Sequence, residues 1–315
     1  MPRGAGDAPI LGGHALKSPR NVAASVRQRL LNRARSEQRP FSELLQYFAM
    51  ERFLFRLSRS DHADRFILKG ALMLLVWRTR DLRPTMDIDL LGKTHNDEAD
   101  IVARMRDILG LDVRPDGLAF DPASVRTERI AEAAEYEGLR VRFEGALGTA
   151  RIHMRIDVGF GDVVYPEPEA TDLPTLLDFP AARMLCYSRE STIAEKFEAM
   201  VKLGLLNSRM KDFYDIWLLS RQFDFNGPEL AEAIRLTFTR RDTALSPVVE
   251  AFTGRFVDDK QAQWSAFRDR LQQDHIPTSF ADITNSISKF LSPVVAAVAA
   301  GDSGPACWTA PGPWT

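Results

Sequence analysis

The chain has 315 residues and a mean hydropathy of −0.20, with 45% hydrophobic and 27% charged residues, which is typical of a globular protein of one or two domains. Its 41 Lys and Arg residues against 43 Asp and Glu give a net charge of −2. This balance excludes a uniformly basic nucleic-acid coat but not a local basic patch. The only cysteines, Cys186 and Cys307, exclude a disulfide framework and favour a reducing compartment.

Several functional classes are excluded by motifs that the sequence lacks. No apolar run approaches the ~18–20 residues of a membrane-spanning helix, and the N-terminus has no apolar signal-peptide core, so no membrane partner is expected. The five histidines and two cysteines show none of the spacings of a zinc site. The sequence therefore predicts a cytoplasmic globular protein.

The first sixty residues predict a basic, mainly helical lead-in. Residues 1–17 lack periodicity and are expected to be a disordered tail. Apolar residues at helical spacing then predict two helices, one starting at Ser18-Pro19 and one over Phe41–Leu57. Residues 1–60 contain 11 Lys and Arg against 4 Asp and Glu, a surplus of seven positive charges that the near-neutral total conceals.

The rest of the chain predicts a small α/β unit followed by a helical half. Strands are expected where apolar and polar residues alternate, at Met86–Leu91, Gly138–Glu144 and Arg151–Val158. Helices are expected at Asp97–Leu109, Ser191–Leu205, Arg209–Ser220, Pro228–Thr239 and Gln261–Gln272. The expected organisation is a lead-in with an α/β core over residues 18–165, a Pro-rich linker over 165–174, a helical domain over 175–292 and a disordered tail over 297–315.

The sharpest chemical feature is the pair Asp87-Ile88-Asp89. Side chains alternate along a strand, so both carboxylates are predicted on one face, ~7 Å apart, while Ile88 points into the core. Two such carboxylates can hold a divalent metal ion. The pattern is short, however, and an ordinary exposed strand face with two acids is the competing interpretation.

Three neighbouring segments strengthen the metal interpretation. Lys69-Gly70-Ala71 precedes a helix, and a flexible backbone at a helix start suits a phosphate. Arg83-Pro84-Thr85 places a cation and a hydroxyl directly before the acids. Asp157 lies on the polar face of the last predicted strand, as a third metal ligand or as a base for an attacking hydroxyl.

The helical half contains a second charged group. Lys196 lies on a helix with an apolar face, and its ammonium group is within reach of a bound triphosphate if the two halves share a cleft. Asp212 and Asp215 share one face of the next helix because they are three residues apart. A salt bridge between the two helices, from Lys196 to Asp212, is the purely structural alternative.

A Gly turn, then Asp-x-Asp, then a later strand carboxylate resembles the DNA polymerase β-like nucleotidyltransferase superfamily. More narrowly, the sequence resembles the AbiEii-type nucleotidyltransferase toxins of type IV toxin–antitoxin systems over roughly residues 20–290. The matching segments are Phe66–Ala71, Arg83–Leu90, Ile156–Val158 and Glu190–Leu219, the last with Ala194-Glu-Lys-Phe197 and Arg209–Asp215. Where the family usually has Gly-Gly or Gly-Ser, this chain has Gly70-Ala71.

The resemblance implies an α+β fold, an α/β nucleotidyltransferase core with a small mixed sheet plus a helical C-terminal half. It implies transfer of a nucleotide from a nucleoside triphosphate, with Mg²⁺ or Mn²⁺, to an RNA acceptor, the 3′ end of tRNA above all, which would block translation. A cognate antitoxin is an expected partner. The implied metal ligands are Asp87, Asp89 and Asp157. Lys196, supported by Asp212, is the implied catalytic cation, and Lys69, Gly70, Ala71, Arg83 and Thr85 are the implied nucleotide-binding residues.

Two alternatives stay open at the level of sequence. The first keeps the chemistry but transfers the nucleotide to a protein side chain or to a small molecule such as an aminoglycoside. The second is a catalytically silent module that binds a nucleotide or a protein and in which the acids form a structural network. Dependence of metal and nucleotide binding on Asp89 separates the second alternative from the enzyme.

Overall fold

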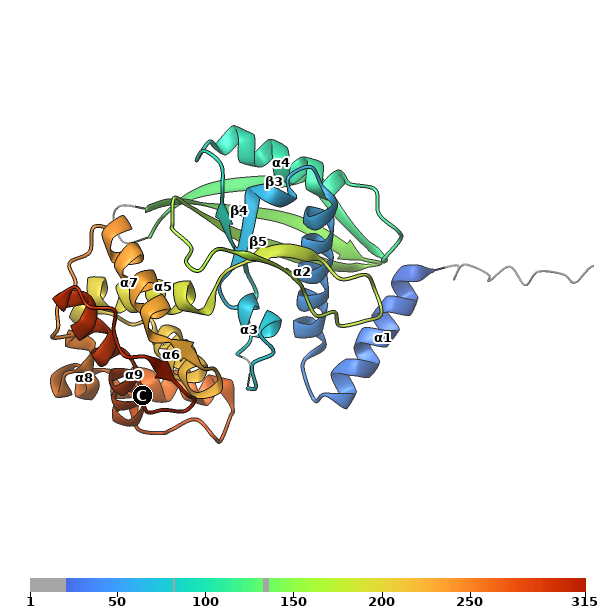
Figure 1. Ribbon diagram of the computed structural model, residues 1–315. Coiled ribbons are helices and arrows are strands. Elements are labelled where there is room, and N and C mark those ends of the chain that lie inside the picture. Colours follow the sequence, from blue (N-terminus) through green and yellow to red (C-terminus); the bar gives the residue numbers. More distant parts are fainter. Residues whose placement is uncertain (1–20, 82, 133–135) are drawn as a thin grey trace, which may run out of the picture.

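The computed structural model describes residues 21–81, 83–132 and 136–315. The predicted tail over residues 1–17 and the predicted helix start at Ser18-Pro19 lie outside the described residues. The described chain forms a sheet half and a helical half, and the orange-to-red C-terminal helices gather on one side of the sheet in Figure 1. The predicted α+β class, a small mixed sheet with a helical C-terminal half, is confirmed.

The sheet half alternates helices and strands. Its helices are α1 (Val22–Ser36), α2 (Phe41–Arg59), the 3-10 turn η1 (Ala63–Arg65), α3 (Leu72–Val76) and α4 (Glu98–Gly110). Its strands are β1 (Phe66–Lys69), β2 (Ile88–Gly92), β3 (Leu118–Glu132), β4 (Tyr136–Leu147), β5 (Ala150–Phe160), β6 (Glu169–Asp172) and β7 (Arg183–Cys186).

The seven strands form one mixed sheet in the order β3-β4-β5-β2-β1-β7-β6. The pairs β2–β5 and β1–β7 are parallel, and all the other neighbours are antiparallel. Strands β2 and β5, which carry Asp89 and Asp157, are therefore direct neighbours in the sheet. Asp89 is in register with Asp157.

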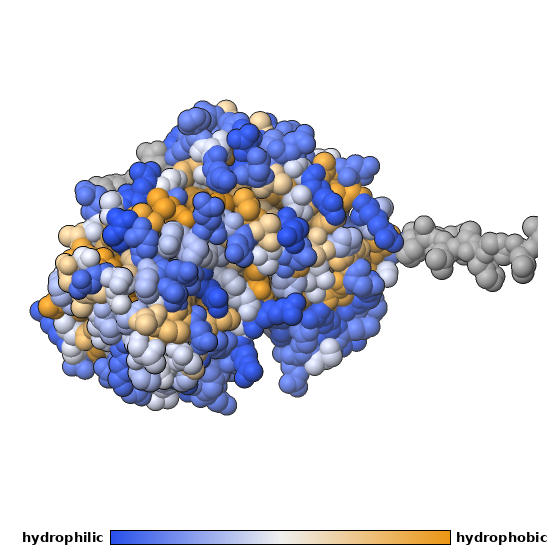
Figure 2. Space-filling model, in the orientation of Figure 1, coloured by the Kyte–Doolittle hydropathy of each residue, from blue (hydrophilic) through white to orange (hydrophobic). Residues whose placement is uncertain are grey.

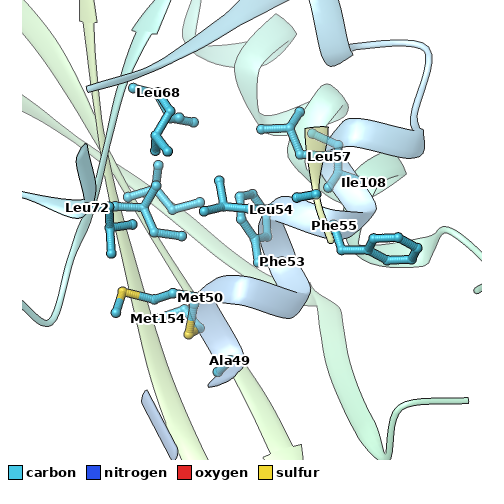
Figure 3. Close-up of a cluster of buried hydrophobic side chains, with 14 of the residues drawn as sticks. Ala49, Met50, Phe53, Leu54, Phe55, Leu57, Leu68, Leu72, Ile108 and Met154 are labelled. Carbon is cyan, nitrogen blue, oxygen red and sulfur yellow. The ribbon is translucent and has the colours of Figure 1, made fainter. Parts of the chain in front are cut away.

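The sheet has one apolar face, and α2 packs against it. Successive side chains of a strand point to opposite faces, so Ile88 and Ile156 are fully buried while the acids next to them lie on the other face. Figure 3 shows Phe53 and Leu54 of α2 in this core. Each such buried side chain contributes about 1.5–3 kcal/mol of hydrophobic stabilisation, which makes the sheet a firm platform.

The helical half has a second hydrophobic core of its own. Its elements are α5 (Arg189–Leu203), η2 (Gly204–Leu206), α6 (Met210–Gln222), β8 (Phe225–Asn226), α7 (Gly227–Arg240), η3 (Glu250–Phe252), α8 (Gly254–Leu271), α9 (Phe280–Ala300) and β9 (Cys307–Trp308). Side-chain caps fix several helix starts: the side chain of Ser188 accepts a hydrogen bond from the Ser191 backbone N–H, and Asn226 accepts one from Glu229.

Among the described helices, α9 is long and apolar enough to cross a membrane if judged by length and composition alone. A core helix of a globular protein has the same composition. The buried side chains of α9 belong to the second core, where the helix contacts α6, α7 and α8.

Residues 297–315 do not form the disordered tail predicted from the sequence. Helix α9 continues to Ala300, and β9 then pairs with β8. Trp308 is 4% exposed and packs on Phe290 with the ring centroids 4.9 Å apart, and Trp314 stacks on the same phenylalanine. Gly and Pro residues suggested disorder, but the buried aromatic rings hold this segment in place.

The expected boundary between the halves was also placed too early. The segment predicted as a linker over residues 165–174 contains β6, and β7 pairs with β1 in the same sheet as far as Cys186. The helical half begins at α5, at Arg189. Strand β3 was not predicted, because Pro122 and a β-bulge between Asp121 and Arg126 break its alternation.

Candidate functional site

A cleft of about 690 Å³ separates the polar face of the sheet from helices α5 and α6. Its volume lies in the range of sites that bind small ligands and cofactors. The sheet residues Lys69, Asp89 and Asp157 line it, as do Lys196 and Asp212 of the helices. The two groups of predicted residues, which are far apart in the sequence, therefore share one cleft. The face of the molecule in Figure 2 is largely hydrophilic, with a notch at its lower edge.

Strand register brings a row of charged residues across the floor of the cleft. Lys69 of β1 pairs with Asp89 of β2, Asp89 with Asp157 of β5, and Asp157 with Arg140 of β4. Residues that are directly opposite each other on neighbouring strands lie on the same face, with Cβ atoms roughly 4.5–5.5 Å apart in antiparallel pairs. Four ionisable side chains from four strands therefore form one row.

Asp89 is at the centre of this row. Among the described acidic residues that line the cleft, its carboxylate alone has no hydrogen bond or ion pair. Burial raises the pKa of Asp89, an effect that the positive charges of Lys211 and Lys69 oppose and the negative charge of Asp157 reinforces. A carboxylate without a partner in such a place costs stability, and metal or substrate binding can offset that cost.

Gly70 makes room for the Asp89 carboxylate. The glycine has a φ of +73°, which other residues rarely adopt, and a Cβ atom at this position would overlap the Asp89 side chain. Helix α3, which follows, has only five residues. The Gly turn was predicted from the sequence as a phosphate contact, and the structure gives it a steric role beside the acid.

The other two predicted metal ligands are held by arginines. Both oxygens of Asp157 accept hydrogen bonds from Arg140, at 2.8 and 2.9 Å, and Asp87 forms an ion pair with Arg155. Asp87 precedes β2 and is not among the described residues that line the cleft. Within the described parts of the chain, no three His, Cys, Asp or Glu side chains gather as a metal-binding group.

On the helical side, an ion-pair network surrounds two buried aspartates of α6. We name Arg83, Lys196, Arg209, Asp212 and Asp215 the α6 network. Asp215 accepts hydrogen bonds from both ends of the Arg83 guanidinium, at 2.7 and 2.8 Å. Lys196 reaches Asp212 at 2.9 Å and Asp215 at 2.7 Å, and Arg209 donates to Asp212 at 2.6 Å.

These contacts hold the aspartates of the α6 network in their charged form. Burial alone would raise the pKa of both, but Lys196 with Arg209 lowers that of Asp212, and Arg83 with Lys196 lowers that of Asp215. The predicted salt bridge from Lys196 to Asp212 is therefore present. Three cations face two carboxylates in the α6 network, so this wall of the cleft keeps a net positive charge.

Lys211 adds a further positive charge to the same wall. Among the described cations that line the cleft, it alone has no hydrogen bond or ion pair. The Lys211 side chain is exposed, but partial loss of water around its ammonium, together with the nearby charges of Lys196 and Arg83, lowers the pKa of Lys211, although Asp212 opposes the shift. A lysine in a cation-rich setting without a carboxylate of its own is suited to bind an anion.

A second network of charged residues also lines the cleft. We name Lys69, Asp162, Glu195, Glu198 and Arg241 the Lys69 network. The Lys69 ammonium is 3.0 Å from Asp162 and 2.8 Å from Glu195. Arg241 binds Asp162 at 3.0 Å and Glu198 at 2.9 Å. Here three carboxylates face two cations, the reverse of the α6 network.

The structure thus brings most, but not all, of the predicted site residues together. Lys69, Gly70, Ala71, Arg83, Asp89, Asp157, Lys196 and Asp212 line the cleft. Asp87 and Thr85 are not among the described lining residues, and the Thr85 backbone N–H donates to the Tyr47 hydroxyl at 3.0 Å. Residues that the sequence did not single out for the site are Arg140, Asp162, Glu195, Glu198 and Arg241.

Some of the missed residues left a signal in the sequence. Glu195 directly precedes Lys196 in a segment that was noted for Lys196 alone. Arg140 lies on a strand that was correctly expected to alternate, so pairing of that strand with β5 would have placed it opposite Asp157. Asp162 follows β5 and Arg241 follows α7, and only the tertiary structure brings them together.

The cleft thus combines a carboxylate without a partner, in register with a second strand acid, and a cation-rich wall opposite, a combination suited to bind a cation and a phosphate group together. Residues 52–286 match the family described as "Nucleotidyl transferase AbiEii toxin, Type IV TA system". This match covers most of the chain, and the protein belongs to that family of nucleotidyltransferase toxins. Membership implies a nucleotide substrate and a cognate antitoxin.

Solved structures with a similar course of the chain come from Helicobacter pylori. One is a protein whose title assigns it provisionally as a nucleotidyltransferase, with 14% sequence identity, a TM-score of 0.46 and coverage of 81% of this chain and 96% of that one. The other is JHP933, with 14% identity, a TM-score of 0.44 and coverage of 79% and 92%. No curated protein sequence matched the chain.

Proposed function

We propose that the protein is a divalent-metal-dependent nucleotidyltransferase that acts on RNA, with the 3′ end of tRNA as the acceptor. The observation that carries the proposal is Asp89, a strand carboxylate without a partner, in register with Asp157 and facing the positively charged α6 network. A new bond would form between the acceptor hydroxyl oxygen and the α-phosphorus, and the bond to pyrophosphate would break. Modification of tRNA in this way would block translation.

On the polar face of the sheet, the position of Asp89 fits a divalent cation. Asp89 offers both carboxylate oxygens, and the absence of a Cβ atom at Gly70 lets the carboxylate pack against the backbone of the Gly turn. Asp157 is the next carboxylate in the row, and Asp87, which the sequence also implied as a ligand, lies two residues before Asp89. A bound Mg²⁺ or Mn²⁺ would supply charge neutralisation at the triphosphate. Hard cations of this kind prefer carboxylate oxygens.

The positive wall would hold the triphosphate. Lys211 has no carboxylate partner and would bind the phosphate oxygens directly. Lys196 and Arg83 are bound to aspartates, so they would act through the net positive charge of the α6 network and not as free cations. Asp212 and Asp215 would keep both side chains in place. Asp157, oriented by Arg140, would position the acceptor hydroxyl or accept its proton.

An RNA acceptor fits the charge distribution of the chain better than a small molecule does. Of the basic residues in 1–60, Arg52 and Arg56 are buried against Asp116, whereas Arg27 and Arg35 of α1 are exposed. A polyanion gains affinity from such a surface. We also place the reaction in the cytoplasm, where tRNA occurs, and both cysteines are free thiols, as a reducing compartment requires.

Label transfer tests this proposal. The protein would be incubated with each α-labelled nucleoside triphosphate, Mg²⁺ and total RNA, and the products separated into RNA, protein and small-molecule fractions. We expect label in RNA of tRNA size and release of pyrophosphate, both abolished by a chelator. Label found only in protein or only in a small molecule would show that RNA is not the acceptor and that the labelled class is. The absence of transfer from all four nucleotides, with every acceptor class present, would refute the proposal.

A further inference from the structure

Lys69 and Asp89 are a cross-strand pair of opposite charge that does not form an ion pair. The two residues are directly opposite each other in the antiparallel pair β1–β2. Oppositely charged side chains in this arrangement normally attract each other across the strands. Here the Lys69 ammonium has carboxylate contacts elsewhere, and the Asp89 carboxylate has none among the described residues.

The ammonium is drawn away by two carboxylates from other elements. Asp162 follows β5 and lies 3.0 Å from the Lys69 Nζ atom. Glu195 on α5 approaches the same atom with both oxygens, at 3.0 and 2.8 Å. The ammonium also lies 5.1 Å from the ring centre of Tyr187, whose hydroxyl donates to Glu195 at 2.7 Å.

The charge balance of the Lys69 network keeps the ammonium there. Three carboxylates share two cations, so the network has a negative surplus that attracts Lys69 more strongly than Asp89 alone. All five side chains are at most 15% exposed, and screening by water is weak at such depth. The Lys69 ammonium is therefore held by the carboxylates of the Lys69 network and not by Asp89.

We propose that Asp162 and Glu195 are positioning residues that hold the Lys69 ammonium away from Asp89, so that the Asp89 carboxylate stays free for a divalent cation. The inference rests on the proposed function, because it concerns the same carboxylate. Without the two acids, Lys69 would swing to its cross-strand partner and compete with the metal ion. Asp162 and Glu195 thus keep Lys69 next to Asp89 in the sheet while preventing an ion pair between the two.

Binding of Mn²⁺ alone, measured by calorimetry on the full chain, tests the proposal without any catalytic step. The double variant Asp162→Asn with Glu195→Gln is expected to bind Mn²⁺ about fivefold more weakly than the wild type, the upper range for a cross-strand ion pair. Adding Lys69→Met to that variant is expected to restore the affinity. The single variant Glu195→Gln should show an intermediate loss. If the affinity is unchanged in the double variant, or stays low after Lys69→Met, the proposal is wrong.

Glu190→Gln is the matched control. Glu190 is a buried acid on the same helix as Glu195, but it is not among the described residues that line the cleft, and the Lys69 ammonium contacts Asp162 and Glu195 instead. The control should leave Mn²⁺ affinity unchanged. An equal loss in Glu190→Gln would show that general loosening of α5, and not release of Lys69, weakens the metal site, and would overturn the proposal.

A second measurement separates this proposal from the proposed function. If wild-type protein binds no Mn²⁺, the proposed metal site is refuted. A double-mutant cycle between Lys69→Met and Asp89→Asn, measured on the folding equilibrium, then tests separately whether Lys69 is held away from Asp89. The cycle should show a weak coupling in the wild type and a stronger favourable coupling, of up to about fivefold in the folding constant, once Asp162 and Glu195 are neutralised. An equal coupling in both backgrounds would overturn the proposal independently of metal binding.

Discussion

The α6 wall of the cleft and its β2 floor carry carboxylates in opposite electrostatic settings. Asp215 is 1% exposed and is bound by Arg83 and Lys196, which hold its pKa below the ordinary range. Asp89 is on the facing strand without a partner, and burial raises its pKa. The first carboxylate is satisfied within the protein, and the second is left for a ligand to satisfy.

This difference teaches which residues hold the site and which act in it. An acid that is bound by two cations, such as Asp215, stabilises the wall and leaves it positively charged. An acid without a cation partner, such as Asp89, reduces stability but is available to bind a ligand. Function concentrates where such costs are retained. Asp89 on the floor and Lys211 on the wall are the two partnerless charges of the cleft among the described residues, and they have opposite signs.

The largest expected effect on stability comes from removing the charge of Asp215, the carboxylate that is bound by two cations in the α6 network. Asp215→Asn leaves the guanidinium of Arg83, which is bound by both oxygens of Asp215, without its carboxylate, and should lower the free energy of unfolding by about 3–5 kcal/mol. Urea unfolding at pH 7 measures it. Because the folded pKa of Asp215 is lowered, its contribution is present above the unfolded value of ~3.9 and is lost as the pH falls below it. A loss below 1 kcal/mol would contradict the structural role.

Lys211→Met should act on binding and not on folding. No ion pair is lost, so the unfolding free energy should change little, while the KM for the nucleoside triphosphate should rise roughly 10–100-fold, the equivalent of one charged hydrogen bond. Steady-state kinetics across nucleotide concentration measures the change. The control is Lys289→Met, an exposed lysine on α9 outside the cleft. An unchanged KM would remove Lys211 from the phosphate site.

Asp89→Asn should stabilise the protein, contrary to the effect at Asp215. Removal of a buried, unpaired charge is expected to raise the unfolding free energy at pH 8 by about 1 kcal/mol. The folded pKa of Asp89 is raised, so the wild type loses stability relative to the variant as the pH rises from the unfolded value of ~3.9 through the folded one. The difference should therefore vanish near pH 3. A variant less stable than the wild type at pH 8 would show that Asp89 has a structural partner.

The smallest effect is expected for the same substitution at an exposed pair. Asp172 and Arg183 form a salt bridge at 3.3 Å between β6 and β7, with side chains 65% and 64% exposed. Asp172→Asn should change the unfolding free energy by less than about 0.5 kcal/mol, because water screens the pair. Urea unfolding beside Asp215→Asn makes the contrast quantitative. Equal losses of unfolding free energy in Asp172→Asn and Asp215→Asn would mean that burial does not determine how much an ion pair contributes to stability.

Much of the fold could be predicted from periodicity. The strands at Met86–Leu91, Gly138–Glu144 and Arg151–Val158 correspond to β2, β4 and β5, because each buries alternate residues on one face. Strands β6 and β7, with four residues each, were missed because their pairing partners, not their own pattern, define them. The aromatic contacts that order the C-terminus likewise depend on residues distant in the sequence.

Most members of the site could be predicted from the sequence, but of its ion pairs only the one from Lys196 to Asp212 was predicted. Asp89, Asp157, Lys196 and Asp212 were identified by residue type and order, and the structure brings them into one cleft. Which of them has a partner depends also on Arg140, Arg209 and Asp215, whose contacts are seen only in the structure. The sequence therefore indicated where charges gather, whereas the structure shows that Asp89 alone of the cleft acids described is left without a partner.

The most direct test of this account compares wild-type protein with Asp89→Asn in the transfer of label from an α-labelled nucleoside triphosphate to RNA, with Mg²⁺ present and both proteins shown to be folded. We expect a loss of about 10³-fold or more in rate, because several kcal/mol of charge stabilisation depend on this carboxylate. Transfer by the variant at the wild-type rate would contradict the assignment of Asp89 as the centre of the site.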